Sequence, residues 1–393
     1  MKYLHLILTM LMPLCAASEG EACAARTEPS VPGEVLEEGY LQQQQARRTR
    51  STRRNVGRAA QQRRRQLREQ GVRNVRAQSP SGWPTKVPVP DETTLQEQPK
   101  QGQFFVYETN NYVFYTPVQL DPNACETVGR LFECAFAANQ AVGEVVPVPR
   151  TEADRSERKY RVDLWPTMAQ YHQNGGPQNS AGVYAFALRR TPDHRGALTE
   201  QQVASDRVIV PFPSLGLDAQ GHVVRNDIET HTLVHELTHQ NFVLNNLPIW
   251  MNEGWAEYIG SVPYVGEDLD FTRCYAVVLQ RATERASQGA LDFPFTLEQF
   301  LTMSQEEMYS YMPRGKDTYT LATMILTFFV HLDGKRGVEA LKKYMQAILD
   351  GESHAEAAQH LIAAHRSAEQ LQKDFIKAWK RKRVEVGFAE VED

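Results

Sequence analysis

Residues His231–Tyr258 read H-T-L-V-H-E-L-T-H-Q-N-F-V-L-N-N-L-P-I-W-M-N-E-G-W-A-E-Y, and the interpretation of the whole chain depends on them. The pattern H-E-x-x-H occupies His235 to His239. On a helix, histidines four residues apart lie one turn along the same face. Two imidazoles at that spacing can bind one Zn²⁺, with Glu236 placed beside a zinc-bound water. The plain alternative is a helix with two surface histidines.

A second acidic pattern follows the histidines. Glu253 lies fourteen residues after His239, within W-M-N-E-G-W-A-E-Y, and Glu257 lies four residues further on. The two glutamates therefore share one face of a second helix. Two histidines and one glutamate leave the fourth position of a tetrahedral ion open, as in catalytic rather than structural zinc sites. We expect His235, His239 and Glu253 to hold one zinc ion.

The two patterns together resemble those of the gluzincin metallopeptidases, and more closely their peptidase-MA-like relatives. The resemblance implies that Glu253 is the third ligand and that Glu257 orients a ligand histidine, His235. It also implies an α+β, zincin-like fold, in which a mixed β-sheet upper subdomain with the active-site helix precedes a mainly helical lower subdomain. The gap from His239 to Glu253 is shorter than in the best-known gluzincins, so the connection must be tight. Leu247-Pro248 is suited to end the first helix and turn.

The resemblance also implies a peptidase mechanism. Glu236, which does not bind the ion, accepts the proton of the attacking water and delivers it to the leaving amine. The oxyanion needs a second donor besides the metal, and Tyr319 is our first choice. Tyr309 and Tyr311 are the alternatives, and for each tyrosine a half-buried packing role remains open.

Peptidases of this kind bind the substrate backbone at the edge of their sheet. The candidate substrate-binding residues are Gly182, Val183, Tyr184, Ala185 and Phe186. The other interpretation of these five is an ordinary buried strand. His231 can contact the site, but we interpret it as a surface histidine. Trp250 and Trp255 flank the third ligand and are interpreted as packing residues.

The rest of the chain predicts strands followed by helices. Strands are expected in a hairpin over Gln103–Thr116 and at Tyr160–Trp165, Ala181–Leu188 and Arg207–Phe212. Helices are expected at Pro122–Gly143 after the capping residue Asp121, and at Thr296–Thr302, Tyr319–Leu332, Val338–Leu349, Ser353–Ala363 and Ser367–Val384. The catalytic domain is therefore expected to span 103–393.

The residues before Gln103 differ in composition from this domain. Residues 1–17 form a signal-peptide pattern, with Lys2 before an apolar run that is too short to span a membrane. Residues 18–78 are Arg/Gln-rich and of low complexity, with 12 arginines and one acid between Leu41 and Gln78. Residues 79–102 contain five prolines and are expected to be an extended spacer.

Two functional classes follow. The first is an exported zinc metallopeptidase, periplasmic or secreted, that cuts peptides or proteins, cell-wall peptides included. The alternative is a non-catalytic surface or binding protein with a structural metal site. In that case the Arg-rich segment 41–78 binds anionic polymers. The sequence indicates no specific nucleic-acid partner and no transmembrane span.

Cysteines and late histidines complete the candidates. Cys125 and Cys134 lie nine residues apart on one expected helix, about 13.5 Å along its axis and too far for a disulfide. Cys274 can pair with one of them in an oxidising compartment. Three histidines of the last helices are interpreted as solvent-facing: His354, His360 and His365.

Overall fold

The computed structural model describes residues 82–91, 93–147, 159–178, 180–192, 198–224, 230–242, 247–265 and 268–390. The predicted signal peptide and the Arg/Gln-rich segment lie outside these residues. Within the described ranges, every helix is too short or too polar to pass through a bilayer.

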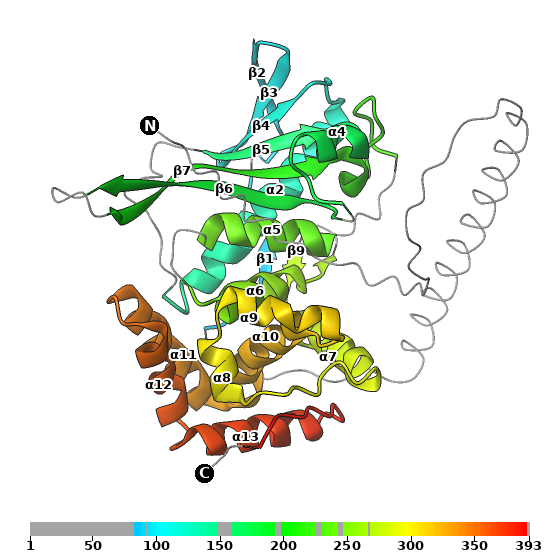
Figure 1. The fold of residues 1–393 in the computed structure, drawn as a ribbon. Helices are drawn as coiled ribbons and strands as arrows, with labels where there is room; N and C mark the ends of the chain where they lie inside the picture. The colour runs from blue at the N-terminus through cyan, green and yellow to red at the C-terminus, as the bar shows by residue number, and fades with distance from the viewer. Residues whose placement is uncertain are drawn as a thin grey trace, which may run out of the picture. The chain divides into compact units, whose positions relative to one another are not determined.

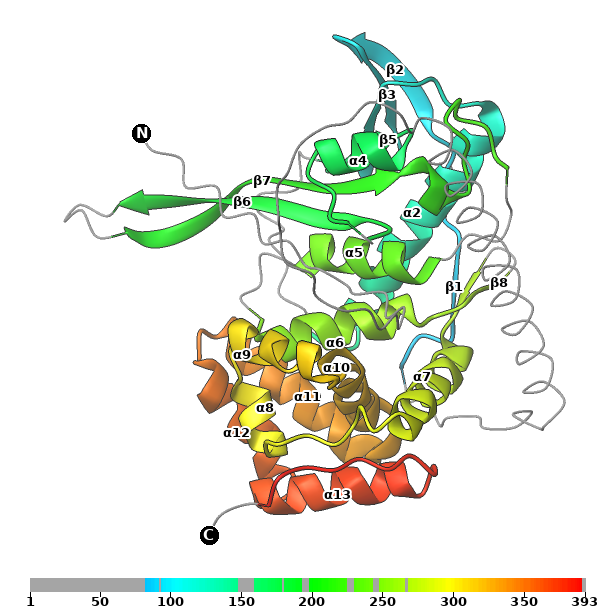
Figure 2. The same ribbon diagram turned by 45° about the vertical axis from the view of Figure 1, so that its right-hand side comes forward.

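The fold is α+β, and its larger sheet has six strands in the order β2-β3-β4-β5-β7-β6 (Figure 1). The β4–β5 and β5–β7 pairs are parallel and the other pairs are antiparallel. The six strands are β2 (Gln96–Gln101), β3 (Phe104–Glu108), β4 (Tyr112–Thr116), β5 (Tyr160–Trp165), β6 (Val183–Pro192) and β7 (Leu198–Pro211). Strand β6 is an edge strand, and with β7 it forms a long hairpin that projects beyond the other strands (Figure 2).

Helix α2 (Pro122–Gly143) connects β4 to β5 and forms as predicted. Asp121 accepts a hydrogen bond from the backbone N–H of Ala124, and proline occupies the first turn, where its missing N–H costs nothing. Phe132 of this helix packs edge-on against Phe114 of β4, with ring centroids 5.0 Å apart. Helix α5 (Thr230–Phe242) packs beside α2 and also contacts β6 and β7. The apolar face of the sheet therefore fixes the position of α5.

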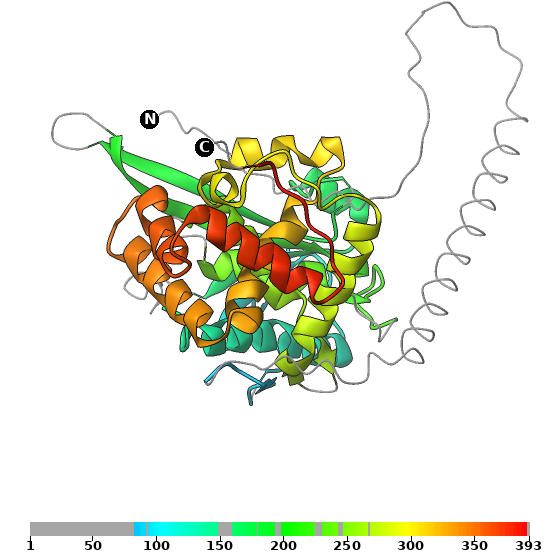
Figure 3. The ribbon, with the colours of Figure 1, turned by 90° about the horizontal axis from the view of Figure 1, so that it is seen from below.

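A mainly helical region follows α5. Its helices are α6 (Ile249–Gly260), α7 (Phe271–Ser287), α8 (Leu297–Thr302), α9 (Gln305–Ser310), α10 (Thr318–Thr327), α11 (Gly334–Leu349), α12 (His354–Ala363) and α13 (Ala368–Lys380). Every residue of α10 is buried, so this is the central helix that the apolar run predicts. The run does not continue as one α-helix, because Phe328–Leu332 form a π-helical turn, η5. Seen from below, α13 crosses this region and packs against α8, α12 and η5 (Figure 3).

The predicted spacer over 79–102 is wrong where the structure describes it. Strand β1 (Lys86–Pro88) forms a second sheet with β9 (Asp268–Asp270) and β8 (Tyr264–Val265), and β2 joins the larger sheet (Figure 2). Trp83 is 4% exposed and donates a hydrogen bond to the Tyr258 hydroxyl at 3.0 Å. Pro99 is tolerated because β2 is an edge strand, where a missing N–H need not break a ladder. The folded region therefore begins before Gln103.

Two smaller expectations are also corrected. Within the part of the chain that the structure describes, Cys125, Cys134 and Cys274 are free and buried, so Cys274 is not paired with either of the other two. His365 does not face solvent: it is 1% exposed, with Nδ1 2.9 Å from Asp374 and Nε2 3.1 Å from Asp333. Asp374 bonds one ring nitrogen of this buried imidazole and Asp333 lies beside the other, although helical spacing alone would place His365 on a surface.

Candidate metal centre

Helices α5 and α6 carry the H-E-x-x-H pattern and the two glutamates, and they pack against each other. Glycines on α6 allow its close approach to its neighbours. A Cβ at Gly260 would lie 2.9 Å from the carbonyl oxygen of His231 on α5, and one at Gly254 would lie 2.8 Å from that of Ala322 on α10. Because neither space admits a side chain, the spacing of α6 from α5 and α10 depends on these two positions.

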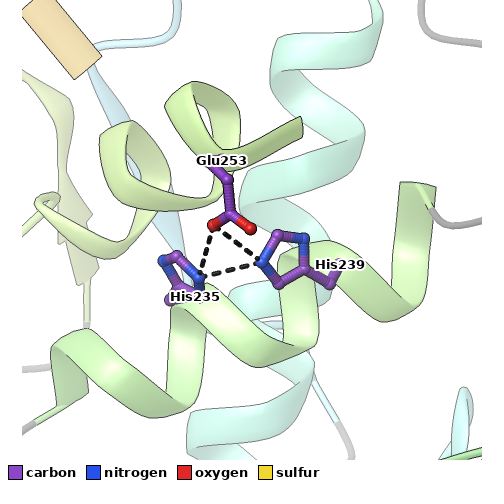
Figure 4. Close-up of side chains that lie close together, drawn as sticks. All are labelled: His235, His239 and Glu253. Atoms are coloured by element: carbon purple, nitrogen blue, oxygen red, sulfur yellow. Dashed lines mark hydrogen bonds and ion pairs between the residues drawn. The ribbon is translucent and has the colours of Figure 1, made fainter. Parts of the chain in front are cut away.

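Three predicted ligands converge between the two helices (Figure 4). The Nε2 atoms of His235 and His239 lie 2.8 Å apart. Glu253 Oε2 is 3.3 Å from the first and 3.4 Å from the second. All three side chains are at most 1% exposed. The two surface histidines of the plain alternative are therefore excluded by their burial.

The donor set fits a zinc ion. Tetrahedral bonds of 2.0–2.1 Å place neighbouring ligand atoms about 3.3 Å apart. Both carboxylate–imidazole distances agree with this spacing. The distance between the two Nε2 atoms, 2.8 Å, would have to increase by about 0.5 Å to reach it. Glu253 Oε2 is buried and accepts no hydrogen bond from the described residues, so the atom that faces both imidazoles is left for a cation.

Each histidine has a partner on its other ring nitrogen. Glu257 Oε1 lies 3.3 Å from His235 Nδ1, where the sequence expects it. Asn252 Oδ1 lies 3.2 Å from His239 Nδ1 and is a contact that the sequence analysis missed. A proton on each Nδ1 leaves the Nε2 lone pairs directed at the candidate metal position. Asn252 directly precedes Glu253, and this adjacency is the signal that could have revealed it.

The charges of the buried carboxylates act strongly on His235. Burial alone would lower the pKa of His235, but the adjacent carboxylates of Glu253 and Glu257 raise this pKa to about 10. Burial would likewise raise the pKa of Glu253, yet the two imidazoles lower it to about 2. Metal-free protein therefore holds a proton between these residues that a metal ion must displace.

Glu236 lies on α5 beneath the edge strand. It is 1% exposed, and its Oε2 accepts a hydrogen bond from the backbone N–H of Tyr184 at 2.9 Å. Burial raises the pKa of the Glu236 carboxyl above its ordinary value, although both histidines oppose this. A carboxylate with a raised pKa is a better proton acceptor near neutral pH.

The three candidate tyrosines take different positions. Tyr309 donates a hydrogen bond from its hydroxyl to Glu253 Oε1 at 3.1 Å. Tyr319 stacks on Tyr309, and the centroid of its ring lies 6.3 Å from that of His235. Tyr311 packs edge-on against Phe295 instead, at 4.8 Å between centroids. The structure therefore brings two of the three tyrosines to the ligands, and Tyr309 makes the direct bond.

The five predicted substrate-binding residues lie at and before the start of β6. Gly182, Val183 and Tyr184 are buried and Ala185 is half-buried, while the side chain of Phe186 lies outside the described part. Where its side chains are described, the start of this edge strand is therefore buried.

His231 is not the plain surface histidine expected. Its side chain is 26% exposed, and its Nε2 lies 3.3 Å from Glu257 Oε2. Trp250 and Trp255 are buried, as expected for packing residues, and the Trp250 indole donates to the backbone oxygen of Leu301 at 2.8 Å.

Comparison with models of known protein families and with curated protein sequences finds no match to this chain.

Proposed function

We propose that this protein is a zinc-dependent metallopeptidase of the gluzincin type. The observation that carries the proposal is the convergence of His235, His239 and Glu253 beside a second buried glutamate, Glu236, which is not one of the three ligands. A structural zinc site is normally closed by four protein ligands, whereas this group supplies three. A zinc ion held there would supply Lewis-acid chemistry to a substrate carbonyl.

The chain's own residues supply the remaining roles. Glu236 accepts a proton from the attacking water and returns it to the leaving nitrogen. The Tyr184 N–H holds the carboxylate of Glu236 at 2.9 Å, which limits the positions it can adopt. Tyr319 is the candidate donor to the developing oxyanion, because Tyr309 gives its single hydroxyl proton to Glu253. The edge of β6 beside Glu236 is the proposed site for an extended peptide.

The N-terminal sequence supports a proposal about location. The signal-peptide pattern over 1–17 favours export, with action in the periplasm or outside the cell. The substrate would then be a peptide or protein of that compartment.

The test combines metal content with hydrolysis. Purified protein is expected to contain about one zinc per chain and to cleave a mixed protein substrate until a chelator is added. Glu236→Gln keeps an oxygen for the Tyr184 N–H and removes the base, so it should retain zinc and lose at least about 100-fold in turnover. Glu133→Gln is the matched control: Glu133 is equally buried, and it bonds Asn111 rather than any ligand.

The outcomes separate the two classes of function. Zinc retention without chelator-sensitive cleavage would favour the non-catalytic protein with a structural metal and an anion-binding Arg-rich segment. Full turnover in Glu236→Gln would remove Glu236 from its role. Failure to bind zinc would eliminate both classes.

A further inference from the structure

Glu257 uses its two carboxylate oxygens for different partners. Oε1 lies 3.3 Å from Nδ1 of the candidate ligand His235. Oε2 forms a short ion pair with Nη1 of Arg281 and lies 3.3 Å from Nε2 of His231. Arg281 belongs to α7, which packs against α6 and α10. A continuous chain of polar contacts thus runs from α7 through Glu257 to His235.

We propose that Arg281 is a positioning residue for the candidate metal centre: by holding Glu257 Oε2, it directs Oε1 to His235 and fixes the orientation of that imidazole. The inference rests on the proposed zinc site. It assigns a role to a residue that lies outside the H-E-x-x-H and N-E-G-W-A-E patterns and that sequence spacing does not reveal.

Glu257 is 0% exposed, and a carboxylate without water needs a partner that compensates its charge. Arg281 provides that charge and, because its guanidinium is planar and rigid, also a direction. His231 alone cannot replace it, since His231 contacts the same oxygen at a longer distance and is charged only when protonated. Loss of Arg281 therefore frees Glu257 to rotate away from His235.

The consequence should be measurable as metal affinity. Partners that orient a ligand histidine typically change the affinity for the metal by about 10- to 100-fold when removed. Arg281 acts one contact further out, through Glu257. We therefore expect a loss of zinc affinity at the lower end of this range.

Helix α7 supplies its own control. Arg285 lies one turn after Arg281, and its side chain has the same 28% exposure. Its ion pair is with Asp317 at 2.7 Å, at the start of α10, and not with Glu257. The two arginines therefore match in helix, exposure and charge and differ in the carboxylate they hold.

The experiment uses the full chain and zinc itself. Zinc dissociation constants are measured by competition with a chromophoric chelator for the wild type, Arg281→Met and Arg285→Met, alongside thermal unfolding of the metal-free proteins. Arg281→Met should weaken zinc binding about 10-fold, while Arg285→Met leaves it unchanged. The visible spectrum of the Co²⁺-substituted protein should change in the first variant and not in the second.

A conservative pair keeps the test decisive. Lysine retains the positive charge but lacks the planar guanidinium group of arginine. Arg281→Lys should therefore lose less zinc affinity than Arg281→Met and more than Arg285→Lys. This lysine pair also decides the question if Arg281→Met fails to fold. Equal zinc affinities in the Arg281 and Arg285 variants would overturn the positioning role.

The readout is independent of peptide hydrolysis. A wild-type protein that binds zinc and cleaves nothing would defeat the proposed peptidase function while the affinities still test Arg281. A wild-type protein that binds no zinc would overturn both.

Discussion

Replacement of Trp83 tests whether the segment before β2 belongs to the folded core. Its indole is 4% exposed and meets Trp255, Tyr258 and His331 edge-on, with centroids 6.0–6.4 Å apart. Removal of a buried tryptophan costs about 3–5 kcal/mol, and its lost hydrogen bond to Tyr258 about 1 kcal/mol of that. Trp83→Phe keeps a ring and loses that bond, so it should cost about 1–2 kcal/mol.

Urea unfolding measures these losses as changes in the free energy of unfolding. Lys86→Ala is the control, because Lys86 lies on the neighbouring strand with a 61% exposed side chain and a 3.8 Å ion pair. Such an exposed pair contributes about 0–1 kcal/mol. If Trp83→Ala destabilises the protein no more than Lys86→Ala does, Trp83 is not part of the core and the spacer interpretation of 79–102 returns.

Three further predictions concern the site and its surroundings. Tyr309→Phe removes the donor to Glu253, so zinc affinity in a chelator competition should fall by about 10-fold, the equivalent of a hydrogen bond to a charged group; unchanged affinity would contradict this contact. Burial lowers the pKa of His331 from 6.5 to about 4. Between these two pH values the unfolded state therefore binds one proton that the folded state does not. As the pH decreases through this window, the free energy of unfolding should fall by about 1.4 kcal/mol per pH unit. In His331→Gln this part of the slope should vanish, and an identical slope would exclude His331 as its source. Gly254→Ala forces a Cβ to within 2.8 Å of the Ala322 carbonyl, so a loss of about 1–3 kcal/mol in urea unfolding is expected, and a stable variant would show that α6 can shift.

The candidate metal ligands were predictable because their spacing is a property of helices alone. His235 and His239 share a face in any helix, as do Glu253 and Glu257, and the fold only had to bring two helices together. Because the two helices follow each other directly in the sequence, their packing against each other was the simplest expectation. The prediction of Glu257 beside His235 is confirmed for the same reason.

Other parts of the site depend on contacts that no spacing encodes. The sequence favoured Tyr319 over Tyr309, but the tyrosine that bonds Glu253 is Tyr309, because the packing of α9 against α10 decides which hydroxyl reaches that carboxylate. Arg281 lies 24 residues after Glu257, on another helix. The burial of Trp83 could not be predicted from its proline-rich neighbours. Such a composition indicates an extended chain both for a linker and for an edge strand of a sheet.

The ligands of the candidate metal centre are neighbours in the sequence, but the side chains that hold them are not. His235 to Glu257 form one short stretch, whereas Tyr184 precedes it and Arg281 and Tyr309 follow it. During synthesis the stretch that carries the candidate ligands leaves the ribosome before Arg281 and Tyr309 do, so two of these three contacts form later. A metal ion bound by these residues would therefore be held tightly only after α7 and α9 have docked.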